Sequence, residues 1–194
     1  MHRPRTRVIA LIAAGTTALA LSLTACSPSS GDPSTRPLRV WSGSMTPINN
    51  DFNPFHVDTA THLTFGAIYE PLFFFNQLSA DPPVGLIGDS YSYSDDGTQL
   101  TITIKPGQKW SDGKPLTAAD VVFTFGYGSN VDPDMTSIEA TDDTTVVIGY
   151  STPKFTAASL ILGSTWIVPE HIWSKIDDYM SETNQQPVGS GPYK

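Results

Sequence analysis

The chain has 194 residues and is acidic, with 19 Asp and Glu against 11 Lys and Arg and a net charge of −8. This balance argues against nucleic-acid binding, because no basic patch is available to neutralise phosphates. One cysteine excludes a disulfide within the chain, and 16 Pro with 15 Gly predict a domain rich in turns and short strands.

The N-terminus has the pattern of a secretion signal. A basic region with three Arg precedes Val8–Leu23, which is apolar and carries no charge. A run this short, interrupted by Gly and Thr, predicts a cleaved signal rather than a membrane-spanning helix. It ends in Leu23-Thr24-Ala25-Cys26, which resembles the lipobox of bacterial lipoproteins.

The lipobox resemblance implies that residues 1–25 are removed and that Cys26 receives fatty acids such as palmitate. Lipidation would anchor a soluble domain at the outer side of the cell membrane without making it span. The alternative is an ordinary secretion signal with an incidental cysteine. Loss of residues 1–25, which hold three Arg and no acid, would change the net charge from −8 to −11.

Residues 26–37 are mostly Ser, Pro, Gly and Thr. Such a segment cannot bury enough apolar surface to fold, so it predicts a flexible tether. We expect the folded chain to begin near Leu38 with a short strand to Trp41 and a loop over 42–54.

The next elements are expected to be short. Apolar spacing predicts a helix over 60–69 and a strand over 72–75, whose three Phe should fill a core. Two alternating runs at 89–93 and 99–105 flank Asp95-Asp96-Gly97, which predicts a β-hairpin.

Residues 105–125 combine turn residues with a helix start. Pro106-Gly107 and Asp112-Gly113 are turn dipeptides. Thr117 followed by Asp120 resembles a capping box, so a helix should run from Thr117 to about Phe125. Later patterns predict strands at 137–140 and 144–150 and helices at 156–162 and 169–176, the last opened by a Pro.

A set of motifs then appears in order along the chain: Tyr69-Glu70-Pro71-Leu72, the hairpin before Lys105, Lys109-Trp110-Ser111-Asp112-Gly113, Pro115-Leu116-Thr117-Ala118-Ala119-Asp120-Val121, Val168-Pro169-Glu170-His171 and Pro187-Val188-Gly189-Ser190-Gly191-Pro192-Tyr193. Together they resemble the family 5 extracellular solute-binding proteins, the oligopeptide and dipeptide receptors of ABC importers. The most specific part is W-S-D-G followed by T-A-x-D-V.

The resemblance implies an α/β (mixed α+β) fold of the periplasmic-binding-protein type II kind. It assigns 38–60 to the start of a first lobe, 61–184 to a small extra domain and 185–194 to a return to the first lobe, with a strand at 191–194. Family members are longer and close a second lobe over the ligand, so we expect this chain to be a fragment in which that lobe is missing. The 105–125 stretch then belongs to the small domain as scaffold.

The implied function is that of a substrate-binding lipoprotein that captures oligopeptides or similar solutes outside the membrane and delivers them to an ABC permease and its ATPase. Some family members take oligosaccharides or metal chelates instead. No cofactor is implied. By position, the main-chain groups of the loop after the first strand should reach the ligand, at Ser44, Met45, Thr46, Ile48 and Asn49.

Other functional classes find less support in the residues. A secreted hydrolase would have to use Glu70 or His171, and no G-x-S-x-G motif is present. A non-transport interaction module is a third alternative. Trp110 and Trp173 are expected to pack in the interior.

Metal binding is not predicted. His56 and His62 stand near Asp51 and Asp58, but their spacing matches no zinc motif. The acidic turns at 95–97 and 132–134 lack the other ligands of a calcium loop.

Overall fold

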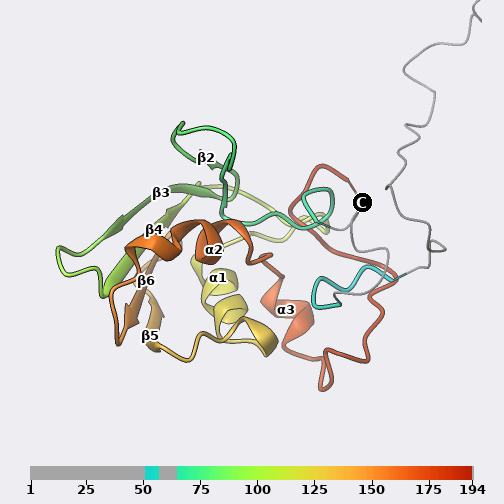
Figure 1. Cartoon of the computed structure of the whole chain (residues 1–194). Coiled ribbons are helices and arrows are strands. Elements are labelled where there is room, and N and C mark those ends of the chain that lie inside the picture. Colours follow the sequence, from blue (N-terminus) through green and yellow to red (C-terminus); the bar gives the residue numbers. More distant parts are fainter. Residues whose placement is uncertain (1–50, 57–64, 194) are drawn as a thin grey trace, which may run out of the picture. The chain divides into compact units, whose positions relative to one another are not determined.

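The computed structural model describes residues 51–56 and 65–193 and contains a four-stranded antiparallel sheet (Figure 1). The strands lie in the order β3-β4-β6-β5, with the bounds Gly88–Tyr93, Gln99–Ile104, Thr145–Tyr150 and Met135–Ala140. The predicted hairpin is therefore confirmed as β3 and β4. The predicted second pair is confirmed as β5 and β6, with β5 beginning two residues earlier than expected.

One face of the sheet carries the main hydrophobic core. Leu100 lies opposite Ile148 and Ile102 opposite Val146 on the paired strands β4 and β6. All four side chains are fully buried. Period-2 alternation places them on the same face, and each buried aliphatic side chain contributes roughly 1.5–3 kcal/mol before the entropy of folding is counted.

Helix α1, Ala118–Phe125, supplies further residues to this core. Its Val121 and Phe125 are buried in the same cluster as the sheet residues. The helix begins after Thr117 and ends at Gly126, as the capping and terminator signals predict.

The remaining helices in the described part of the chain are short. The 3-10 helices η3 and η4 and the α-helices α2 and α3 span Gly128–Asn130, Phe155–Ala157, Ala158–Gly163 and Glu170–Trp173. The helix expected at 156–162 is confirmed by η4 and α2. The helix expected at 169–176 is shorter than predicted, and Pro169 stands at its N-cap.

A second, two-stranded sheet pairs β1, Phe73–Phe74, with β2, Val84–Gly85. The expectation that the three successive Phe fill the core is wrong for Phe74, whose exposed fraction is 56%. Phe73 is buried and Phe75 packs partly against the main core. Successive side chains of a strand point to opposite faces, so three Phe in a row cannot all face inward.

Two other expectations differ from the structure. The helix predicted at 60–69 is not present in its described part, where the Gly66 N–H donates to the Tyr69 carbonyl at 2.8 Å in a turn. Phe65 instead stacks on Trp166, with ring centroids 4.6 Å apart. The strand predicted at 191–194 is not formed over residues 191–193, and the strand predicted at 38–41 lies outside the described residues.

The described residues, 51–56 and 65–193, belong to one compact unit. A second buried cluster lies around Trp173, which contacts Phe55 and Tyr127 edge to face. Within residues 51–56 and 65–193, none of the helices has the length and apolar character needed to cross a membrane.

Candidate functional site

The buried carboxylate of Asp120 is the centre of the motif cluster. It accepts hydrogen bonds from the Thr117 N–H at 2.9 Å, the Trp110 Nε1–H at 3.2 Å and the Glu170 N–H at 3.0 Å. One side chain thus joins the W-S-D-G loop, the start of α1 and the start of α3. Asp120 is only 5% exposed, and these three donors compensate for the hydrogen bonds to water that its carboxylate loses on burial.

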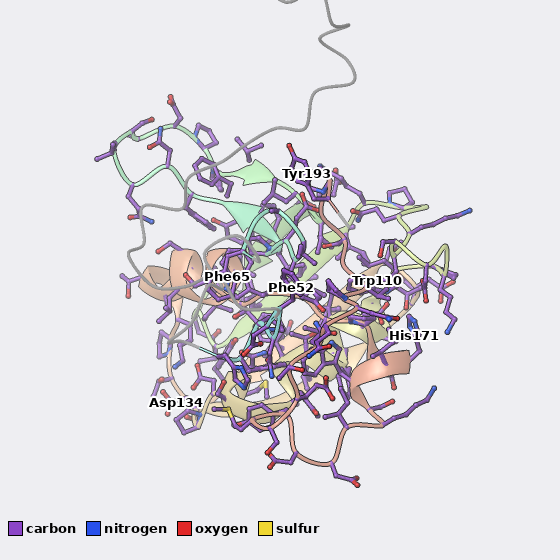
Figure 2. All side chains as sticks on the ribbon, turned by 90° about the vertical axis from the view of Figure 1, so that its right-hand side faces the viewer. Phe52, Phe65, Trp110, Asp134, His171 and Tyr193 are labelled. Atoms are coloured by element: carbon purple, nitrogen blue, oxygen red, sulfur yellow. The ribbon has the colours of Figure 1, made fainter. Side chains whose placement is uncertain are left out.

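The W-S-D-G loop itself is an ordered turn. Gly113 has φ +90, a conformation that side chains with a Cβ rarely adopt, and its N–H donates to the Trp110 carbonyl at 2.8 Å. His171 Nε2 lies 2.8 Å from Asp112 Oδ2. Partial burial alone would raise the pKa of Asp112, but the Lys114 N–H and His171 hold it below its usual value. In Figure 2 the labelled Trp110 and His171 both lie on the right of the view.

The G-S-G-P-Y segment runs beside this loop. Ser111 donates its N–H to the Gly189 carbonyl at 3.0 Å. Further along, the Gly191 N–H donates to the Ile68 carbonyl at 2.8 Å and the Tyr193 N–H to the Ala67 carbonyl at 3.0 Å. Residues 67–68 and 191–193, which are more than a hundred residues apart, are therefore joined by main-chain hydrogen bonds.

Residues 51–56 are held against a loop near the C-terminus. The Phe52 N–H donates to the Thr183 carbonyl at 2.9 Å. Asn53 is fully buried, and its side-chain amide donates to the carbonyls of Tyr179 and Glu182, both at 2.6 Å. These bonds satisfy both amide hydrogens of Asn53.

Tyr69 is hydrogen-bonded to Asn184 of the same loop, and its hydroxyl remains neutral. Burial raises the pKa of Tyr69 to about 12, and the Asn184 amide, which donates to its hydroxyl at 2.7 Å, opposes part of that shift. The hydroxyl therefore stays protonated at physiological pH and serves as a structural hydrogen-bonding group.

Glu70 and His171, the residues that a hydrolase would need, are engaged with different partners. Burial raises the pKa of Glu70, and the charge of Lys105 opposes the shift. His171 is engaged with Asp112, and the main-chain N–H of Glu70 donates to Ser190 Oγ at 3.2 Å. Among the described residues, no hydrogen bond links the Glu70 and His171 side chains.

One pocket of about 260 Å³ lies between α1, β6 and α2, lined in part by Tyr150, Asn130 and Asp132. Its carboxylate is already paired, because Lys154 Nζ lies 3.1 Å from Asp132 Oδ2 and 2.8 Å from Asp134 Oδ2. Within the described ranges no group of three or more His, Cys, Asp or Glu is placed to hold a metal ion.

The residues predicted from the sequence to carry function lie outside the described residues. This holds for the lipidation site Cys26 and for the predicted ligand contacts Ser44, Met45, Thr46, Ile48 and Asn49. Their roles stay predictions. Trp110 and Trp173 are both buried, which confirms the expectation that they pack in the interior.

Two features of this region differ from their interpretation in the sequence. The sequence indicates only a helix cap for Asp120, although its carboxylate also accepts hydrogen bonds from Trp110 and from the start of α3. His56 and Asp51 are weighed in the sequence only as possible metal ligands, whereas in the structure His56 Nδ1 lies 2.7 Å from Asp51 Oδ2.

Comparison with known proteins places these features in a family. The model of the bacterial extracellular solute-binding proteins, family 5 Middle, matches residues 82–194. A putative ABC transporter peptide-binding protein of Brucella ovis is 30% identical over 161 residues, which cover 76% of this chain and 30% of that protein. The probable peptide-binding protein YejA of Agrobacterium fabrum is 29% identical over 140 residues, covering 66% of this chain and 23% of that protein.

Solved structures show the same fold. The periplasmic oligopeptide-binding protein of Thermotoga maritima, crystallised with mannohexaose, is 33% identical with a TM-score of 0.67, over 74% of this chain and 28% of that chain. The oligopeptide-binding protein AppA of Bacillus subtilis, in complex with a nonapeptide, is 27% identical with a TM-score of 0.62, over 74% and 31%.

The chain spans about a quarter of the length of the curated relatives it matches. The predicted mixed α/β fold is confirmed as part of the substrate-binding protein fold. Since the family model covers more than half of the chain and includes the W-S-D-G and G-S-G-P-Y motifs, this chain belongs to the bacterial extracellular solute-binding proteins of family 5.

Proposed function

We propose that this chain is part of the substrate-binding lipoprotein of an ABC importer, which captures oligopeptides or similar solutes outside the membrane and delivers them to the permease and its ATPase. The observation that carries the proposal is the family match over residues 82–194. It is supported by relatives whose names identify them as peptide-binding proteins of ABC transporters.

Two similar structures support the proposed solute class. AppA of Bacillus subtilis holds a nonapeptide, and the Thermotoga maritima protein holds mannohexaose. We propose that the main chain at Ser44, Met45, Thr46, Ile48 and Asn49 contributes to such a site. The fixed attachment of residues 51–56, which begins two positions after Asn49, supports this placement.

The domain boundaries remain part of the proposal. Residues 38–60 would start the first lobe, 61–184 would form the small extra domain, and 185–194 would return to the first lobe. The hydrogen bonds that join 67–68 to 191–193 and Phe52 to Thr183 support a close association of the flanking segments. The W-S-D-G unit then acts as a joint in the scaffold.

The lipid anchor at Cys26 is tested by metabolic labelling with a fatty-acid analogue. Wild-type protein should be labelled and Cys26→Ser should not, because the thiol is the acceptor. Ser34→Ala, in the tether, is the matched control and should be labelled like wild type. Equal labelling of wild type and Cys26→Ser would exclude the anchor.

We infer that the protein is not an enzyme, on the support of relatives that are named as binding proteins. A secreted lipoprotein hydrolase is the rival, and a non-transport interaction module the third alternative. The rival predicts turnover of peptide or glycoside substrates that is lost in Glu70→Gln or His171→Gln. Turnover abolished by either change would favour the hydrolase over the receptor.

A further inference from the structure

His56 has a hydrogen-bond acceptor at each of its ring nitrogens. Its Nδ1 lies 2.7 Å from Asp51 Oδ2, and its Nε2 lies 2.8 Å from the carbonyl oxygen of Met180. A carboxylate and a carbonyl can only accept hydrogen bonds. Asn53 Nδ2 is also 3.3 Å from Nε2, but both hydrogens of that amide already point to the Tyr179 and Glu182 carbonyls.

Only the doubly protonated ring fits these partners. A neutral ring protonated on Nδ1 would set the lone pair of Nε2 against the Met180 carbonyl. A neutral ring protonated on Nε2 would set the lone pair of Nδ1 against the Asp51 carboxylate. Either tautomer leaves two acceptors in contact below 3 Å, whereas the imidazolium donates to both.

We propose that His56 is a positioning residue that acts as a pH-dependent latch: its imidazolium holds residues 51–56 against the loop 179–184, and loss of the proton releases that hold. The two halves of the latch are 124 residues apart in sequence. The latch therefore ties the chain just after the predicted ligand loop to the chain just before the G-S-G-P-Y segment.

The surroundings of His56 favour the charged ring. On its own segment the charged neighbour is Asp51. The facing chain, 176–184, carries Asp177, Asp178 and Glu182 with Tyr179 and holds no Lys or Arg. Asp178 accepts the Met180 N–H at 3.1 Å and Glu182 accepts the Asn184 N–H at 2.6 Å, so both carboxylates also order the loop.

The direction of the pH effect follows from the raised pKa of the His56 ring. Burial alone favours the neutral form, but the Asp51 hydrogen bond, the Met180 carbonyl and the Asp51 charge together raise the pKa of His56 above 6.5. A raised folded-state pKa gives a contribution that is fully present below about pH 6.5 and is lost as the pH rises through the folded pKa.

The consequence for solute capture rests on the proposed function. If Ser44–Asn49 contacts the solute, opening of the latch should weaken binding at higher pH. The latch itself is measured without any solute, so its failure and the failure of the proposed function can be told apart.

The experiment uses the full 194-residue chain and two readouts. Proton NMR of the His56 ring should give a titration midpoint above 6.5. Hydrogen exchange of the Phe52 amide, corrected for the intrinsic effect of pH, should become at least about threefold faster once the pH exceeds that midpoint. That amide reports on the latch because it donates to Thr183.

Two variants separate the latch from general packing. The side chain of His56→Gln cannot donate to both Asp51 and Met180 as the imidazolium does. The Phe52 amide should therefore exchange faster than in wild type at low pH, and its exchange rate should show no step with pH. Asp51→Asn should instead keep the latch closed above the wild-type midpoint. The new side-chain amide can donate to Nδ1 of a neutral His56 ring, whose Nε2–H still donates to the Met180 carbonyl. The amide oxygen can still accept the hydrogen bond from the Asn53 N–H, which in the wild type lies 3.0 Å from Asp51 Oδ1.

His171→Gln is the matched control, because it removes the other histidine that lies against a carboxylate in the described part of the chain. It should leave the pH step at Phe52 unchanged. A His56 midpoint below 6.5, or a pH step that persists in His56→Gln, would overturn the latch. A step that survives in Asp51→Asn would contradict the role assigned to Asp51.

Discussion

Asp120 is the residue on which the motif cluster depends most. Its carboxylate accepts from Thr117, Trp110 and Glu170, and it is buried. In Asp120→Asn the new amide would place its own hydrogens against at least one of these donors. We expect a loss of roughly 2–3 kcal/mol in the free energy of unfolding, measured by urea denaturation.

Thr117→Ala is the matched comparison for Asp120→Asn. It alters the same helix start but leaves the buried carboxylate and its donors in place, so it should cost only about 1 kcal/mol. Equal losses in the two variants would show that Asp120 acts as a cap alone. A smaller loss in Asp120→Asn than in Thr117→Ala would contradict its role as a joint.

The capping role of Asp120 could be predicted from the sequence, and its wider role could not. Thr117 and Asp120 are three residues apart, a spacing that has a local meaning. The contact with Glu170 spans 50 residues, and the spacing of side chains along the chain carries no information on it. His56 is similar, since Asp51 is near in sequence and Met180 is not.

At the scale of elements, the segment 187–193 depends on close approach of two backbones. A Cβ built on Gly189 would overlap the carbonyl oxygen of Ile68, whose backbone cannot move aside as a side chain can. We expect Gly189→Ala to lower the free energy of unfolding by about 1–3 kcal/mol. Faster hydrogen exchange at the Gly191 amide, which donates to the Ile68 carbonyl, would show that the destabilisation is located at this contact.

Gly126→Ala is the control for the change at Gly189. Its Cβ would meet nothing nearer than the Val122 carbonyl oxygen at 3.4 Å, and Gly126 has φ −91, which other residues adopt. It should have little effect on stability or on exchange at Gly191. If Gly189→Ala were as mild as Gly126→Ala, the close packing of the segment would be disproved.

Elements with strictly local signals were predicted correctly. The β3–β4 hairpin followed from alternation around Asp95-Asp96-Gly97, and α1 followed from its cap. The helix expected up to Tyr69 failed in its described part because its apolar residues have separate long-range partners. Phe65 stacks on Trp166, while Tyr69 is bound by Asn184. Apolar spacing indicates burial, but it does not identify the partner.

At the scale of the whole molecule, the affinity of this chain for a solute should be limited by the share of its relatives' length that it spans. It spans 20–30% of its curated relatives. In a receptor that encloses its solute, much of the affinity comes from surfaces on both sides of the ligand. Calorimetry on the 194-residue chain should therefore detect no peptide or oligosaccharide that binds in the micromolar range, with full-length AppA as the positive control.

Micromolar binding by this chain alone would contradict that view. The solute would then be held by residues of the chain itself. The site would have to be sought among them, beginning with Ser44–Asn49.

A role of the protein in solute import is tested most directly by uptake. Cells from which the gene has been deleted should accumulate less of at least one class in a labelled panel of oligopeptides, oligosaccharides and metal chelates. A wild-type copy should restore that uptake, and a copy lacking residues 38–194 should not. Uptake of every solute unchanged by the deletion would contradict the proposed function.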